Sequence, residues 1–157
     1  MKVGEIMTRN PISCTASSSV KTAAELMLLK DTGVLPVTEG AFNHTVVGVV
    51  TDRDLCRAVL GQGRDAAHVW IRECMSQDPA CCRPEDDVEK VIRLMATRQV
   101  RRIPVVDEKG NLEGIVTISD LVRRHAIIAA ALYDLMEKIY ESSAKVDKQV
   151  GTATRAA

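Results

Sequence analysis

Two stretches of the sequence decide the fold: GVVTDRDL at residues 48–55 and GIVTISDL at residues 114–121. Each contains a glycine, two aliphatic residues, a threonine, two variable residues, an aspartate and a leucine. The copies lie 66 positions apart in a chain of 157 residues. A motif that recurs at a fixed spacing indicates a duplicated structural unit.

The similarity extends upstream of both stretches, where the offset is 68 residues. EIMTRNPISCTASSSVKTAAELM at 5–27 aligns with ECMSQDPACCRPEDDVEKVIRLM at 73–95, and LPV at 35–37 aligns with IPV at 103–105. The offset falls to 66 because the first copy has two more residues in a loop with the composition of a turn, where insertions are tolerated. The chain therefore contains two homologous units of about 60 residues each.

Each unit predicts the order strand, helix, strand, strand, helix. Apolar residues recur at helical spacing after the start signals SSSV at 17–20 and PEDDV at 84–88. A unit of this size buries only about 60% of its unfolded surface and is marginal alone. Two units that pack sheet against sheet would complete one core. The prediction is an α+β fold of two β-α-β-β-α repeats with pseudo-twofold symmetry and two equivalent clefts between them.

The expected boundaries are 1–62 for the first repeat, 63–125 for the second, and 126–157 for a C-terminal amphipathic helix and tail. Ile128, Leu132, Leu135, Met136 and Ile139 form one apolar stripe on that helix. Such a stripe needs a partner. It either folds back onto its own repeats or contacts a second copy or another protein.

Composition excludes several classes of function. Lys and Arg number 21 and Asp and Glu also number 21, and only 3% of residues are aromatic, so nucleic acid and anionic membranes are not expected partners. No apolar run is long enough for a membrane span or a signal peptide, and we expect a cytoplasmic protein. The five cysteines show no C-x-x-C spacing, which favours reduced thiols and no metal site.

The paired motifs, the LPV and IPV strands and the lead segments IMTRNP and CMSQDP resemble a tandem CBS domain pair, or Bateman module, over residues 3–125. The resemblance is to stand-alone CBS domain proteins. It implies a regulatory, non-enzymatic module that binds AMP, ADP, ATP or S-adenosylmethionine in clefts between the repeats and signals by conformational or oligomeric change. It further implies a homodimer, an unidentified regulated protein, and no required cofactor.

The resemblance also implies roles for the repeated motif. The aspartate would accept hydrogen bonds from ribose hydroxyls and the threonine or serine would contact phosphate, which assigns Thr51 with Asp54, and Thr117 and Ser119 with Asp120. A carboxylate that accepts two vicinal hydroxyls makes charge-assisted hydrogen bonds. The helix that starts at the motif offers free N–H groups to a phosphate.

Each cleft is implied to take its aspartate from one repeat and its adenine-facing wall from the other. Apolar, shallow walls suit a purine, although each wall residue taken singly also fits a place in the core. The wall facing Asp120 would contain Met7, Pro11, Ile12, Gly33, Val34 and Leu35. The wall facing Asp54 would contain Met75, Pro79, Ala80, Arg101, Arg102 and Ile103.

Charge distinguishes the two clefts. Arg101 and Arg102 stand where relatives often place basic residues that reach phosphate, so we expect phosphate-bearing ligands to depend on them. In the first motif Arg53 would help to hold a phosphate, whereas Asp52 would repel one. Because relatives with this charged version do not all bind nucleotide, the sequence favours the cleft of Asp120.

Two other readings stay open. Thr-x-x-Asp at a strand-to-helix junction is also a capping box, and capping alone would select the same residues in a ligand-free interaction or stress-response protein. An enzyme that uses Cys81 or Cys82 as a nucleophile is disfavoured, because no motif places a general base beside them.

Overall fold

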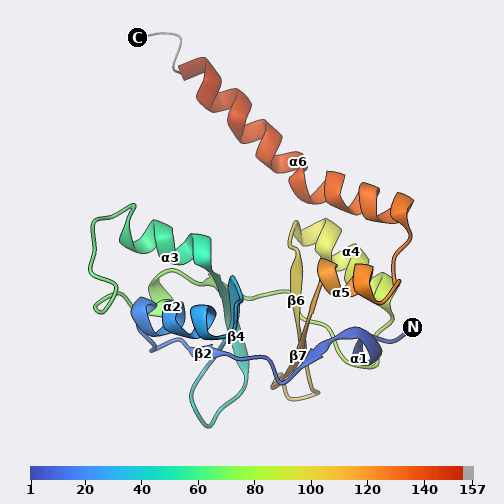
Figure 1. The fold of residues 1–157 in the computed structure, drawn as a ribbon, viewed down its shortest axis with the longest axis horizontal. Coiled ribbons are helices and arrows are strands. Elements are labelled where there is room, and N and C mark those ends of the chain that lie inside the picture. Colours follow the sequence, from blue (N-terminus) through green and yellow to red (C-terminus); the bar gives the residue numbers. More distant parts are fainter. Residues whose placement is uncertain (154–157) are drawn as a thin grey trace.

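The structure, a computed structural model, describes the backbone of residues 1–153 and the side chains of residues 1–141. The two repeats lie side by side, each a small sheet with two helices packed against it (Figure 1). The first part contains α1 (Val3–Ile6), β1 (Thr8–Arg9), β2 (Cys14–Thr15), α2 (Val20–Leu29), β3 (Val34–Thr38), β4 (Val46–Thr51) and α3 (Asp52–Val59). The second contains a 3-10 helix (Ile71–Glu73), β5 (Ser76–Gln77), α4 (Val88–Arg98), β6 (Arg102–Val106), β7 (Leu112–Thr117), α5 (Ile118–Arg123) and α6 (Ala129–Ala153).

The sheets are built by exchange between the repeats. Their strand orders are β2-β3-β4-β5 and β1-β7-β6. β1 pairs antiparallel with β7, with Thr8 opposite Ile115, and β5 pairs antiparallel with β4, with Ser76 opposite Val49. Each lead strand therefore completes the sheet of the other repeat. The predicted α+β fold of two pseudo-symmetric repeats is confirmed, and the exchange is an addition to it.

The exchange explains the glycine that opens both motifs. A Cβ atom at Gly48 would lie 2.8 Å from Sδ of Met75 and 2.9 Å from the carbonyl oxygen of Ser76. At Gly114 it would lie 2.5 Å from Sδ of Met7 and 3.0 Å from the carbonyl oxygen of Thr8. The lead strand approaches so closely that no side chain fits beneath it.

The two cores are exchanged in the same way. Val3, Ile6 and Met7, at the start of the chain, are buried in the core of the second repeat. Val69 and Ile71, which follow the first repeat in sequence, are fully buried in the core of the first. The hydrophobic burial that stabilises each repeat thus requires the lead segment of the other.

The second repeat lacks the full first strand that the repeat pattern predicts. In the first repeat, the N–H of Ala16 donates to the carbonyl of Thr38 at 3.2 Å and continues the ladder of β2. The aligned residue in the second repeat is Pro84, which has no N–H. The pairing there is a single parallel bridge between Cys82 and Val105.

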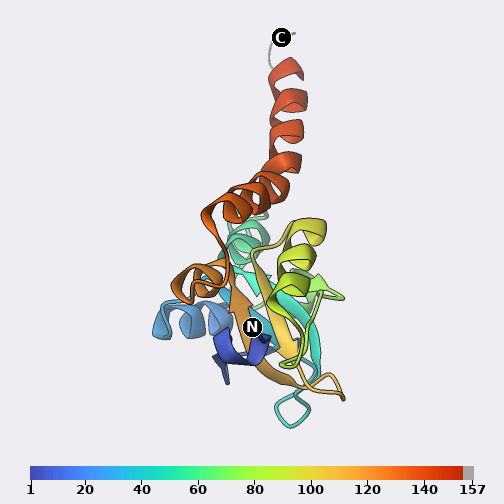
Figure 2. The same cartoon turned by 90° about the vertical axis from the view of Figure 1, so that its right-hand side faces the viewer.

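The C-terminal helix folds back onto its own chain over its first turns. Leu135 and Ile139 are 2% and 6% exposed and belong to the core of the second repeat, where α6 packs against α4 (Figure 2). Leu132 and Met136 are half-buried, whereas Ile128 is 73% exposed. Within residues 1–153, no helix combines the length and the apolar character needed to cross a membrane.

The tight approach at Gly48 predicts a cost for any side chain there. Gly48→Ala should lower the free energy of unfolding by about 1–3 kcal/mol, the usual penalty for overpacking, measured by urea denaturation. Gly40→Ala is the matched control, because nothing lies within 4 Å of a Cβ atom at Gly40. Equal stabilities for the two variants would contradict the account of the exchanged strands.

Candidate functional site

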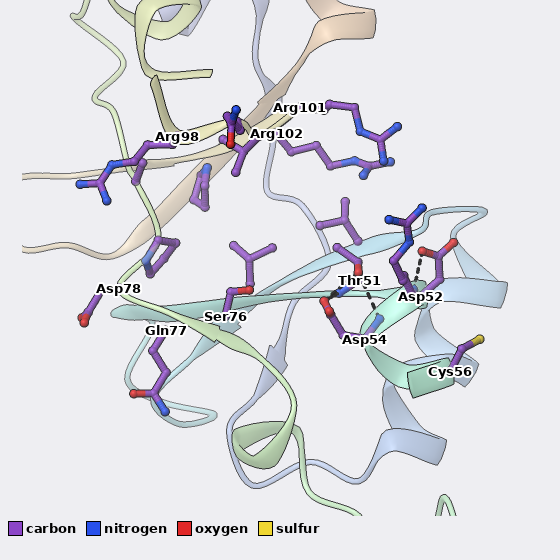
Figure 3. A pocket seen from close by; sticks show the side chains of 18 residues that line it. Thr51, Asp52, Asp54, Cys56, Ser76, Gln77, Asp78, Arg98, Arg101 and Arg102 are labelled. Atoms are coloured by element: carbon purple, nitrogen blue, oxygen red, sulfur yellow. Dashed lines mark hydrogen bonds between the residues drawn. The ribbon is translucent and has the colours of Figure 1, made fainter. Parts of the chain in front are cut away.

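A cleft of about 890 Å³ lies between the two repeats (Figure 3). One wall comes from the end of β4 and the start of α3. The facing wall comes from the end of α4, the start of β6 and the segment that follows β5. The predicted ligand residues that the structure brings together in this cleft are Thr51, Arg53, Asp54, Pro79, Ala80, Arg101 and Arg102. Val34, predicted for the wall facing Asp120, lines this cleft instead, because β3 pairs with β4 and Val34 lies opposite Thr51.

Thr51 and Asp54 form a reciprocal capping box at the start of α3. The N–H of Asp54 donates to Oγ1 of Thr51 at 3.3 Å. Oδ2 of Asp54 accepts hydrogen bonds from N and Oγ1 of Thr51, at 2.9 and 2.7 Å. All of these bonds to the carboxylate use Oδ2. Among the described residues no hydrogen bond reaches Oδ1 of Asp54, and Asp54 lines the cleft.

The second motif has the same capping box but a different environment. Oδ2 of Asp120 accepts from N and Oγ1 of Thr117 at 2.9 and 2.7 Å. Oδ1 of Asp120 accepts from Nη2 of Arg123 at 2.8 Å, and the residue is only 4% exposed. Both oxygens of this carboxylate are therefore engaged within the repeat, and its charge is paired.

The difference between the motifs does not follow from residue type. Arg57 stands at the position of the first motif that corresponds to Arg123. Within residues 1–141, Arg57 forms no ion pair with Asp54. Both copies thus have an aspartate followed three residues later by an arginine, but only in the second copy do the two side chains form an ion pair.

Arginines dominate the wall opposite Asp54. Figure 3 shows Arg101 and Arg102 extending over the end of the cleft where Thr51, Asp52 and Asp54 lie. Burial lowers the pKa of Arg102 and the neighbouring Arg101 lowers it further, while Asp52 acts in the opposite direction. Two adjacent cations, one of them half-buried, form a place where a bound anion is favoured.

The cleft also has negative charge and apolar surface. Asp52 and Asp78 line it besides Asp54, and Oδ1 of Asp52 accepts a hydrogen bond from the backbone N–H of Arg53 at 2.8 Å. Pro79 and Ala80 are half-buried and present apolar surface. Chemically, the cleft combines the carboxylates of these aspartates, several guanidinium groups and an apolar patch within one space.

The other predicted site residues lie elsewhere. Leu35 and Ile103 are fully buried in the two cores, and Met7 packs over Gly114. The carbonyl of Gly33 accepts a hydrogen bond from the N–H of Asp52 at 3.1 Å. The two cavities described between residues 1 and 141 have no lining residue among Thr117, Ser119, Asp120, Pro11 and Ile12.

The structure thus favours the cleft of Asp54, whereas the sequence favoured that of Asp120. The physical reason is the ion pair of Asp120 with Arg123, which the sequence pattern does not reveal. The cleft also contains lining residues outside the predicted set, among them Cys56, Ser76, Gln77 and Gln99. Ser76 and Gln77 would follow from the exchange of lead strands, had the pairing been known. No cluster of metal-ligating side chains is present in the described part of the chain.

The unequal environments of the two aspartates predict unequal costs of substitution. Asp120→Asn weakens the hydrogen bonds that the buried carboxylate accepts from Thr117 and from the exposed Arg123, so the free energy of unfolding should fall by about 1.5–3 kcal/mol. Asp54→Asn should cost about 0.5–1.5 kcal/mol, because the residue is half-buried and loses only capping strength. Chemical denaturation of both variants measures the difference. Equal losses would show that the ion pair of Asp120 adds nothing.

Comparison with known proteins agrees with the duplicated fold. The CBS domain family model matches residues 3–61 and 71–126. The CBS domain-containing protein YhcV of Bacillus subtilis is 34% identical over 119 residues, which cover 76% of this chain and 81% of YhcV.

Two similar solved structures are complexes with adenosine-containing ligands. CBSX2 in complex with AMP is 32% identical, with a TM-score of 0.68 over 80% of this chain and 96% of that one; CBSX2 is a protein of Arabidopsis thaliana. The CBS domain pair of MJ0100, in complex with 5'-methylthioadenosine and S-adenosyl-L-methionine, is 25% identical, with a TM-score of 0.70 over 80% of this chain and 96% of that one. From the two family matches and the exchanged, duplicated fold, the chain belongs to the CBS domain family and contains a tandem pair of CBS domains.

Proposed function

We propose that the chain is a regulatory module that binds an adenosine-containing ligand between its CBS repeats and signals by a conformational or oligomeric change. The site is the cleft of Asp54, and the preferred ligand is an adenine nucleotide with at least one phosphate. One observation carries the proposal. Asp54, whose Oδ1 accepts no hydrogen bond among the described residues, lines the same cleft as Arg101 and Arg102.

Each part of a nucleotide has a partner of suitable chemistry. Oδ1 of Asp54 accepts from a ribose hydroxyl without disturbing the capping box, which uses Oδ2. Arg101 and Arg102 supply the charge for a phosphate, helped by Arg53 at the N-terminal end of α3. Pro79 and Ala80 provide apolar surface for the purine.

Charge favours a phosphate-bearing ligand over S-adenosylmethionine. A sulfonium ligand would bring a positive charge close to Arg101 and Arg102; burial, and then repulsion by Arg101, already lower the pKa of Arg102. A phosphate relieves that repulsion. Among the relatives, CBSX2 with AMP matches this preference, and MJ0100 with its two sulfur-containing adenosine ligands shows that the family is not limited to it.

A ligand-free interaction or stress-response protein is the second candidate. Both capping boxes are complete from protein groups alone, so the repeated pairing of Thr51 with Asp54 and of Thr117 with Asp120 has a structural use. Under this alternative neither cleft binds an adenosine ligand, and the chain acts through a partner protein or a homodimer. Binding measurements separate the two candidates directly.

Titration calorimetry with AMP, 2'-deoxy-AMP, adenosine and S-adenosylmethionine is the first test. We expect AMP to bind best, and Asp54→Asn to weaken AMP about tenfold to hundredfold, as expected for lost hydrogen bonds to a charged group. Because the 2'-hydroxyl is part of that contact, the preference for AMP over 2'-deoxy-AMP should shrink in the variant. Arg102→Gln should weaken AMP but leave adenosine unchanged.

Two charge-matched controls keep this test specific. Glu108→Gln and Arg93→Gln each remove one exposed charge outside the cleft and should leave AMP affinity unchanged. A ligand at 100 times its dissociation constant adds about 2.7 kcal/mol to the stability of the folded state, which thermal unfolding detects. Absence of binding across the panel would favour the ligand-free interaction protein.

Cysteine labelling gives an independent test of the ligand's position. Cys56 is exposed and lines the cleft, whereas burial raises the pKa of both Cys14 and Cys82 to about 12. A raised pKa leaves less of the reactive thiolate at pH 8, so iodoacetamide should label Cys56 well before Cys14 and Cys82. Saturating AMP should slow the labelling of Cys56, followed by peptide mass spectrometry. Unchanged labelling in the presence of bound AMP would place the ligand elsewhere.

A further inference from the structure

We propose that Tyr140 of α6 is a positioning residue for Arg101, and that α6 is therefore part of the ligand site; this inference rests on the proposed function. Nη1 of Arg101 donates a hydrogen bond to Oη of Tyr140 at 2.9 Å. The guanidinium carbon of Arg101 also lies 5.9 Å from the centre of the Tyr140 ring. Arg101 lines the cleft, and Tyr140 lies behind it on the C-terminal helix.

Tyr140 is well placed to hold another side chain because its own helix is anchored. The residue before it, Ile139, is 6% exposed, and Leu135 one turn earlier is 2% exposed, both in the core of the second repeat. Nε2 of Gln99, another residue of the cleft, donates to the carbonyl of Lys138 at 3.2 Å. Two residues of the cleft, Gln99 and Arg101, are thus hydrogen-bonded to Lys138 and Tyr140 of α6.

The chemistry of the contact leaves Arg101 competent to bind an anion. A neutral phenol holds the guanidinium without cancelling its charge, in contrast to Asp120, which pairs with the charge of Arg123. A guanidinium has five N–H donors, and Tyr140 uses one of them. The remaining donors are available to a phosphate.

Holding the side chain in place favours binding. Arg101 is exposed, and a free arginine loses rotamer entropy when a ligand immobilises it. Where Tyr140 has already restricted the side chain, that loss precedes binding and the affinity for phosphate rises. By linkage, a bound phosphate must in turn strengthen the docking of α6. Binding of a ligand in the cleft thereby changes how firmly α6, which extends to Ala153, is docked.

The test compares AMP with adenosine, which has no phosphate, on the full chain. Tyr140→Phe removes the hydroxyl and keeps the ring, and it should weaken AMP about threefold to tenfold, the range for immobilising one long side chain, while adenosine binding stays unchanged. Tyr133→Phe is the matched control, since Tyr133 lies on the same helix and is 71% exposed. The affinity ratio is the readout, because a general loss of structure would change both ligands alike.

A double-mutant cycle tests whether Tyr140 acts through Arg101. In an Arg101→Gln background, Tyr140→Phe should have no further effect on AMP. Hydrogen exchange supplies the reciprocal measurement: AMP should slow amide exchange in residues 129–141 of the wild-type chain, and less so in Tyr140→Phe.

The outcomes separate the inference from the function on which it rests. A fall in AMP affinity that is confined to chains with Arg101, and absent for adenosine, supports the positioning role. An unchanged ratio of AMP to adenosine affinity in Tyr140→Phe overturns that role while the nucleotide site stands. If the wild-type chain binds neither AMP nor adenosine, the proposed function fails, and the role of Tyr140 fails with it.

Discussion

The close approach of the exchanged lead strands over Gly48 and Gly114 is the constraint on which the rest of the structure depends. Because β5 lies on β4, the segment that follows it, with Pro79 and Ala80, is carried to the side of the first repeat. The end of β4 in turn places Thr51 and Asp54 at the same opening. The cleft between the repeats therefore results from the pairing of the exchanged strands, β5 in the four-stranded sheet and β1 in the three-stranded sheet. The segments around these strands also complete the two cores.

Much of this could be predicted from the sequence, because duplication, capping boxes and helical periodicity are local patterns that repeat in register. The strand exchange could not, since two-residue strands have no periodicity to detect, and their partners lie in the other repeat. Nor could the asymmetry of the clefts. Arg57 and Arg123 occupy equivalent positions, and only side-chain conformation decides that Arg123 alone pairs with the aspartate of its motif. The loss of one strand at Pro84 was readable in principle, since a proline aligned with Ala16 removes a ladder donor.

Electrostatics in this chain is a matter of local arrangement rather than total charge. Lys and Arg balance Asp and Glu, at 21 each, yet Arg101 and Arg102 lie together at one cleft with Asp52 as the nearby countercharge. The second repeat uses another of its arginines, Arg123, to neutralise a buried carboxylate. The second repeat thus contains arginines in two different states. Arg101 is bonded to the neutral phenol of Tyr140 and keeps its charge uncompensated, whereas the charge of Arg123 is balanced by the carboxylate of Asp120.

The ion pair of Asp120 with Arg123 has a consequence for how the duplication can be used. Arg123 lies three residues after Asp120 on the same helix and bonds to its carboxylate. Because both groups belong to one helix, the effective concentration of Arg123 at Asp120 is far above that of any diffusing molecule. A free ligand would have to displace it and leave a guanidinium without its counterion. Under the proposed function, duplication has left one motif available to a ligand and a second motif whose carboxylate is already paired within its own helix.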